Sequence, residues 1–296
     1  MNARQWHIGR GELLVLLAAA VWGVAFYFQK TAMDHIGPFL FLALRGAVAV
    51  LVLAPFAVRE CRAHPAAFRT TLPVATMGGL TFVIAGSLQQ FGLITASVTN
   101  TGLLTALYVL TTPFMYWVLE RDKPEPMIWV CAAIALLGVW LLTGADLTTL
   151  SQGDVLVVAA TLGWGALFVL NGKGAQVLPL TYVTVQFSVV AVIALLLALI
   201  TEPIVWADVL AAGSSVLYVG VLSTAFTFGM MSLALRHVSA PRAALILSCE
   251  VVFAALAGFV LLDERLSLVG WFGAGLILLA IVLIRIRPQT EKNQAP

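Results

Sequence analysis

The stretch GELLVLLAAAVWG at residues 11–23 returns later in the chain as GDVLVVAATLGWG at residues 153–165. In both stretches a glycine and an acidic residue begin an apolar run, and a Trp-Gly pair follows within it. All four matching positions are separated by the same offset of 142 residues. Because a common offset at four positions is hard to obtain by chance, we interpret the two stretches as corresponding parts of an internal repeat.

The repeated stretches lie in a chain with the composition of a membrane protein. Of its 296 residues, 61% are hydrophobic and 10% are charged, and the mean hydropathy is +1.01. Soluble domains contain about 45–50% apolar and about 25% charged residues, so the composition excludes an ordinary soluble enzyme and a disordered chain. A bilayer core about 30 Å thick requires about 20 apolar residues per helical span. Apolar runs of that length lie near residues 12–32, 38–58, 71–92, 98–119, 127–144, 153–173, 180–200, 214–235, 241–262 and 267–286.

We expect these runs to be helices, because they are longer than the strands of a membrane barrel and lack an alternating pattern. The distribution of Lys and Arg orients them. With the N-terminus in the cytoplasm, nearly all basic residues outside the spans fall on the cytoplasmic side, and only Lys30 and Arg265 fall on the other. The pattern predicts ten transmembrane helices with both termini cytoplasmic. A net charge of +2 without a basic tract argues against a nucleic-acid partner.

The repeat divides the spans into two halves, residues 1–148 and 149–296. A second pair of similar motifs supports this division, since LER at residues 119–121 follows the fourth span and DER at residues 263–265 follows the ninth. Each half has five spans, an odd number, so the second half must enter the membrane from the opposite side. We therefore predict an all-α integral membrane protein of two inverted five-helix repeats. This construction is typical of secondary transporters, whose binding site lies near the midplane between the repeats.

Several motifs resemble those of one transporter family. They are AVWGVAF at residues 20–26, Pro38 with Leu44-Arg45 in the second span, TALY at residues 105–108 with Thr112-Pro113 and Glu120-Arg121, and AALILSCE at residues 243–250 leading to Asp263-Glu264-Arg265. Over nearly the whole chain they resemble the EamA-type ten-helix permeases of the drug/metabolite transporter superfamily. That family commonly has a proline after the intramembrane glutamate, where this chain has Val251.

The resemblance implies a secondary transporter of the inner (plasma) membrane that works by alternating access, and bacterial amino-acid exporters, including the aromatic amino-acid branch, look most similar. We expect export of amino acids, with a drug, nucleoside or other metabolite exporter of the same fold as the alternative. A channel is less favoured, because a pore does not need two inverted halves. The sequence has no P-loop, no histidine inside a span and no metal-ligand spacing, so we expect no enzyme activity, cofactor or metal. The expected partners are a small-molecule substrate, the lipid bilayer and protons as coupling ion, with the chain acting as a monomer.

Two charged residues lie inside spans. Glu250 is near the centre of the ninth span, where an ionised carboxylate costs about 2.5 kcal/mol or more unless it is paired or solvated. It either binds a substrate ammonium or carries a proton, or it is a structural group capped by a neighbouring helix. Arg45 could attract a substrate carboxylate, pair with a buried acid or extend to the interface. Because the second helix of the family is usually peripheral to the cavity, we expect Arg45 to be structurally paired.

Polar and aromatic residues at mid-span give the remaining candidates. Thr101, Thr105, Tyr108 and Thr112 follow one another at steps of four, three and four, which places them on one helix face. Such a stripe serves either polar helix packing or a cavity lining. We expect the substrate cavity to be formed by the first, third, fourth, sixth, eighth and ninth spans, with no catalytic residue. The expected lining residues are Trp22, Gln90, Thr101, Thr105, Tyr108, Trp164, Phe168, Tyr218, Thr227 and Glu250.

Overall fold

The computed structural model describes residues 9–96, 98–144, 151–176, 178–253, 256 and 267–286. This part of the chain is helical and contains no strand. Its elements are α1 (Arg10–Met33), α2 (Pro38–Ala63), α3 (Pro65–Thr95), α4 (Val98–Thr105), α5 (Tyr108–Glu120), α6 (Pro126–Thr143), α7 (Gln152–Gly174), α8 (Pro179–Thr201), α9 (Trp206–Ala211), α10 (Gly213–Leu217), the π-helical segment η2 (Tyr218–Phe226), α11 (Thr227–Ala234), α12 (Ala240–Leu247) and α14 (Leu268–Ile286).

The helices follow the spans expected from the sequence, with three of them interrupted. The fourth span consists of α4 and α5, and the eighth consists of α10, η2 and α11. The ninth begins with α12 and continues helically at residues 249–253, while its far half and the DER motif at 263–265 lie outside the described residues. The short helix α9 before the eighth span is an element that the hydropathy pattern does not indicate.

The outer surface of the bundle is apolar. Large hydrophobic side chains such as Leu51, Ile200 and Leu268 are 75%, 80% and 89% exposed. Of the described helices, seven are long and apolar enough to cross a membrane, and the segments Pro126–Leu142 and Leu268–Ile284 are shorter apolar helices. Apolar residues outside and polar residues within are the reverse of a soluble bundle, and they confirm an all-α membrane protein.

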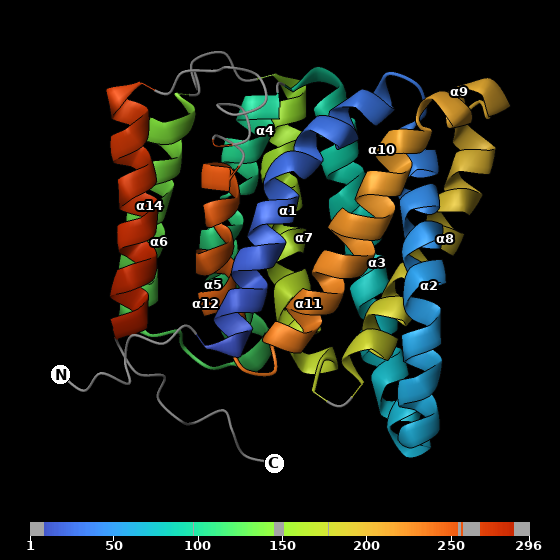
Figure 1. The fold of residues 1–296 in the computed structure, drawn as a ribbon, viewed down its shortest axis with the longest axis horizontal. Helices are drawn as coiled ribbons and strands as arrows, with labels where there is room; N and C mark the ends of the chain where they lie inside the picture. The colour runs from blue at the N-terminus through green and yellow to red at the C-terminus, as the bar shows by residue number, and fades with distance from the viewer. Residues whose placement is uncertain are drawn as a thin grey trace.

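Helix pairs from different halves of the sequence lie side by side (Figure 1). At one end of the bundle α6 packs on α14, and at the other end α2 packs on α8, with α1, α7 and α11 between them. Facing glycines bring α6 and α14 together, because a Cβ at Gly138 would lie 2.6 Å from the carbonyl oxygen of Gly273. Small residues of this kind allow membrane helices to approach backbone to backbone.

The repeated Gly-acid motif has a structural explanation. A Cβ at Gly153 would clash with the carbonyl oxygen of Gly92 on α3, and a Cβ at Gly11 would lie 2.8 Å from a side-chain carbon just after α11. The acids that follow, Glu12 and Asp154, each accept a hydrogen bond from the backbone N–H three residues earlier, at 3.1 and 2.7 Å. Each motif therefore seats the start of a span against a neighbour and satisfies one unpaired donor at its N-terminus.

Two apolar clusters make up most of the interior. One involves α1, α5, α6, α12 and α14, and the other involves α2, α3 and α8. Trp22 and Trp164, the tryptophans of the repeated stretches, pack against both clusters. The space between the clusters is therefore the centre of the molecule, and the two halves each direct a tryptophan toward it.

Candidate substrate cavity

A cavity with about 540 Å³ of empty space, including its mouth, lies between the two clusters. Its lining comes from α1, α2, α3, α4, α5, α7, η2, α11 and the ninth span. Of the helices in the described ranges, α6, α8 and α14 contribute no lining residue.

Aromatic rings contribute six of the fourteen residues that line the cavity. The ring centroid of Trp22 lies 5.1 Å from that of Phe228 and 6.4 Å from that of Phe168, and all three line the cavity. Trp164 also lines the cavity and packs edge-on against Phe82 with a centroid separation of 5.1 Å. These rings bury large apolar areas and hold one another in tilted and edge-to-face geometry. The wall therefore suits an apolar or aromatic group of a ligand.

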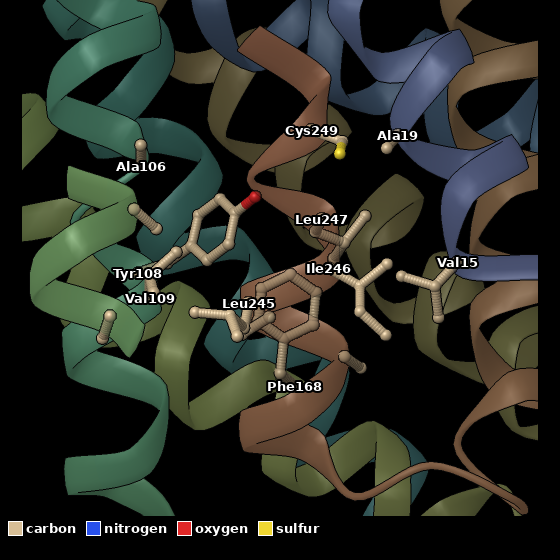
Figure 2. Packing of buried hydrophobic residues seen from close by; sticks show 14 of the residues in the cluster. Val15, Ala19, Ala106, Tyr108, Val109, Phe168, Leu245, Ile246, Leu247 and Cys249 are labelled. Carbon is tan, nitrogen blue, oxygen red and sulfur yellow. The ribbon is translucent and has the colours of Figure 1, made fainter. Parts of the chain in front are cut away.

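A tyrosine and a glutamate from different halves meet at the cavity. The Tyr108 hydroxyl donates a hydrogen bond of 3.2 Å to Glu250 Oε1, and both side chains are 3% exposed. In Figure 2 the Tyr108 ring extends from α5 toward the helix that carries Leu247 and Cys249, with its hydroxyl nearest that helix. Among the ion pairs of the described residues, none involves Glu250. Within the described residues the carboxylate is thus held by one neutral donor and forms no ion pair.

Helix interruptions occur beside these residues. A turn at Ala106-Leu107 immediately precedes Tyr108, and a turn at Ser248 precedes Glu250. The Ser248 hydroxyl donates a hydrogen bond of 2.6 Å to the carbonyl oxygen of Leu245, so this helix is interrupted without the proline of the family pattern. The eighth span also departs from α-helical geometry where it lines the cavity, in η2. Discontinuous helices at mid-membrane are characteristic of transporter binding sites, and π-helical segments frequently occur at functional sites.

Arg45 on α2 also lines the cavity. Its Nε donates a hydrogen bond of 3.0 Å to the hydroxyl of Thr224, and its guanidinium carbon lies 5.5 Å from the ring centroid of Phe82. We expected a structural acid partner, and in the described part of the chain this expectation is wrong, since no carboxylate pairs with Arg45 there. The second span is therefore part of the cavity, through this single residue.

Two hydrogen-bonding atoms on the cavity lining have no partner among the residues that the structure describes. The Trp22 indole N–H donates to the carbonyl oxygen of Ser223 in η2 at 2.7 Å, whereas the indole nitrogen of Trp164 is buried and has no acceptor. The Thr105 hydroxyl on the same lining is also unpartnered. Buried polar groups are normally satisfied, so these two are available to a ligand or a water molecule.

In the described residues, no group of three or more His, Cys, Asp or Glu side chains is placed to hold a metal ion. The cavity offers a ligand a carboxylate, a guanidinium, unpartnered donors and an aromatic wall.

Comparison with known proteins identifies the fold family. A family model described as the EamA-like transporter family matches residues 9–144 and matches again at residues 151–286. This chain belongs to the EamA-like transporter family. Its similarity to the drug/metabolite transporter superfamily is thereby confirmed, and the protein is a multi-pass membrane transporter, not an enzyme.

Individual EamA-like relatives are similar over most of their length. An uncharacterized transporter of Archaeoglobus fulgidus is 27% identical over 282 residues, which cover 93% of this chain and 86% of the relative. The threonine/homoserine exporter RhtA of Escherichia coli K12 is 28% identical over 288 residues, covering 90% of this chain and 88% of RhtA. A solved crystal structure with 18% identity has a TM-score of 0.75 and covers 93% of this chain and 96% of its own, which shows the same fold.

Six of the ten residues expected on the cavity of this EamA-like protein line it in the structure: Trp22, Thr105, Tyr108, Trp164, Phe168 and Glu250. The other four are Gln90, Thr101, Tyr218 and Thr227, and the lining does not include them. Gln90 donates to Gln29, which does line the cavity.

The remaining three residues of that group lie against neighbouring groups. Tyr218 donates a hydrogen bond of 3.1 Å to the carbonyl oxygen of Val21 and stacks on Phe28. Thr227 donates to the carbonyl oxygen one turn earlier in its own span. Thr101 is buried and its hydroxyl has no partner.

Sequence reasoning missed part of the lining on α1. Phe26 and Gln29 line the cavity with Trp22, at positions four and seven residues along the same helix. That spacing is the signature of one helix face, so the anchor at Trp22 could have located both. Gln89 lines the cavity rather than Gln90, and no sequence signal separates these adjacent glutamines.

Proposed function

We propose that this protein exports amino acids across the inner membrane by alternating access. In this proposal residues 1–148 and 149–296 are the inverted halves that rock about the central cavity, and both termini are cytoplasmic. Protons are the coupling ion, and the chain acts as a monomer.

The observation that carries the proposal is the environment of Glu250. This carboxylate lies inside the bundle on an aromatic-walled cavity, and its one hydrogen-bond partner in the described residues is the hydroxyl of Tyr108. A buried carboxylate is costly without a cation, and a substrate ammonium would supply one. The aromatic wall would then receive the substrate side chain. Similarity to a relative named as a threonine/homoserine exporter points to the same substrate class.

Export of a drug or nucleoside is the second candidate. The tilted rings of Trp22, Phe168 and Phe228 could equally stack on a nucleobase or an aromatic cation. A substrate panel must therefore include both classes.

Counterflow in proteoliposomes tests the proposal. Vesicles loaded with unlabelled substrate are assayed for accumulation of labelled phenylalanine, threonine and alanine, and in parallel for uridine and ethidium. Saturable exchange of amino acids is the expected result, with an imposed pH gradient changing its rate. Exchange of uridine or ethidium alone would establish the second candidate, and an ohmic current would indicate a channel. Empty vesicles supply the background for every substrate.

A further inference from the structure

Arg45 is a buried cation that is held in place by neutral groups. The side chain is 5% exposed, and its Nη1 lies 3.5 Å from Gln29 Oε1 while its Nε donates to Thr224. The guanidinium carbon lies 5.7 Å from the ring centroid of Phe41 and 5.5 Å from that of Phe82. These contacts fix the direction of the guanidinium without neutralising its charge.

The hydrogen bonds of Arg45 leave part of its guanidinium free for a ligand. They use Nε and Nη1, and in the described residues no acceptor contacts Nη2. Gln29 accepts hydrogen bonds from both Arg45 and Gln90, so the amide of Gln29 is itself oriented. Arg presents a planar fork of donors that matches the two oxygens of a carboxylate.

An unpaired guanidinium inside the membrane is expensive. Insertion of an arginine at the centre of a span costs about 2.5–3.5 kcal/mol even by the lowest scale, and residues of this kind are found paired or facing a water-filled cavity. Arg45 faces the cavity and has no carboxylate partner in the part of the chain that the structure describes. The missing counter-charge is therefore expected from whatever occupies the cavity.

The same cavity carries the opposite charge on Glu250. Its Oε1 accepts from Tyr108, and no described donor contacts Oε2. Arg45 and Glu250 do not form an ion pair with each other. One cavity thus presents a cation from α2, an anion from the ninth span and an aromatic wall. A molecule that carries both charges and an apolar group fits this arrangement.

We propose that Arg45 is a substrate-binding residue that binds the α-carboxylate of a zwitterionic amino acid, while Glu250 binds its ammonium group and the aromatic wall receives an apolar side chain. The assignment rests on the proposed function and deepens it, because it states which end of the substrate each half of the protein holds. Gln29 and Thr224 are positioning residues, since they act through Arg45.

Three ligands that share a phenyl group test the assignment. They are phenylalanine, phenylethylamine, which lacks the carboxylate, and 3-phenylpropionate, which lacks the ammonium. The measurement is the concentration of each that halves the counterflow of labelled phenylalanine in proteoliposomes. In the wild-type protein, loss of either charged group is expected to raise this concentration at least about tenfold, because each loss leaves a buried charge unpaired.

Variants then assign each charged group to a residue. Arg45→Gln is expected to abolish the preference for phenylalanine over phenylethylamine and to keep the preference over 3-phenylpropionate. Glu250→Gln is expected to abolish the preference for phenylalanine over 3-phenylpropionate and to keep the preference over phenylethylamine. Each ratio is taken within one preparation, so it does not depend on how much protein folds. Arg59→Gln removes an exposed charge from the same helix and is expected to leave both ratios unchanged.

If Arg45→Gln cannot be recovered folded, Arg45→Lys replaces it. The variant keeps the positive charge but loses the planar guanidinium with its paired donors. It is expected to reduce the preference for phenylalanine over phenylethylamine without abolishing it. The assignment would be overturned if phenylethylamine competed as well as phenylalanine in the wild type. It would also be overturned if both Arg45 variants kept the wild-type preference for phenylalanine over phenylethylamine. In either case the proposed function would still stand. No exchange of any amino acid by the wild type would reject the proposed function itself.

Discussion

Glu60 and Glu202 cap the same helix pair at opposite ends. Glu202, just after α8, accepts hydrogen bonds of 2.8 Å from the backbone N–H groups of Phe39 and Leu40 in the first turn of α2. Glu60, near the end of α2, accepts from the first turn of α8, with a distance of 2.8 Å at the N–H of Thr181. Each helix therefore ends in a carboxylate that satisfies the unpaired donors at the start of its partner, across the two halves of the chain.

We expect Glu60→Gln and Glu202→Gln each to lower the thermal stability of the detergent-solubilised protein. A neutral amide weakens the interaction with the helix N-terminus, at a cost of about 1 kcal/mol for each cap. The two effects should add in the double variant, because the caps lie at opposite ends of the helix pair. Asp34→Asn, an exposed carboxylate at the end of α1, serves as the control and should leave the melting temperature unchanged. Wild-type melting of both single variants would mean that the caps contribute no stability.

The Glu250→Gln substitution separates transport from folding. It keeps the size of the side chain and its ability to accept from Tyr108, but it removes the charge and the site of protonation. We expect counterflow to fall at least about tenfold, as for the loss of a charge-assisted contact. Arg45 and Tyr108 are the other titratable side chains on the lining, so the pH profile of any remaining transport should flatten if Glu250 carries the proton.

Tyr108→Phe is the companion to that variant. It removes the hydroxyl that donates to Glu250 and leaves the Glu250 carboxyl in place, so stability should fall while transport remains dependent on pH. If instead Glu250→Gln loses only thermal stability and its surviving fraction transports with the wild-type pH profile, Glu250 is structural.

Truncation of the aromatic wall should affect large substrates most. Trp22→Ala removes a ring that packs on Phe168 and Phe228, and it is expected to weaken competition by phenylalanine about tenfold while alanine is little affected. The measurement is the half-maximal concentration for each amino acid in counterflow. Trp206→Ala, whose ring is 72% exposed on α9, is the matched control. An equal loss for every amino acid would point to packing or gating rather than to contact with the side chain.

Hydropathy predicts the helices of this protein well, because each span is a local property of about 20 residues and needs no knowledge of its neighbours. The interruptions were harder to foresee. Ala106-Leu107 and Ser248 include neither proline nor glycine, so no helix-breaking residue marks these two interruptions in the sequence. The glutamates at positions 60 and 202 likewise read as ordinary loop charges, because the helix ends that they cap are distant in sequence.

The cavity residues also divide into those that the sequence predicts and those that depend on other spans. Trp22, Trp164 and Glu250 could be proposed from sequence, because a large ring or a charge at mid-span is unusual in any surroundings. Arg45 could not be assigned, since its neighbours Gln29 and Thr224 come from two other spans. The rotation of each helix about its axis decides such contacts, and hydropathy does not determine that rotation when the whole helix is apolar.

Single cysteines test the orientation of the spans. In a protein whose native cysteines are replaced, Arg62→Cys is exposed in the last turn of α2, Arg236→Cys is exposed just after α11, and Asp208→Cys is exposed on α9. Both arginine positions should react with a membrane-impermeant maleimide only from the cytoplasmic side, and position 208 only from the outside. Because the later loops all change sides if one span is miscounted, external labelling at either arginine position would contradict the ten-span topology with cytoplasmic termini.

Substitution of Gly138 by alanine should loosen the peripheral helix pair without altering the cavity. A Cβ at Gly138 on α6 would lie 2.6 Å from the carbonyl oxygen of Gly273, and one at Gly273 would lie 2.5 Å from that of Gly138, so either change forces the two backbones apart. Overpacking of this kind costs about 1–3 kcal/mol. Because α6 and α14 contribute no described residue to the cavity lining, the melting temperature should fall while the relative affinities for different amino acids stay as in the wild type. Gly275→Ala is the matched control on α14, since a Cβ there meets no atom within 4 Å. A change in substrate preference on Gly138→Ala, with Gly275→Ala unchanged, would show that the α6–α14 pair takes part in transport rather than only supporting the bundle.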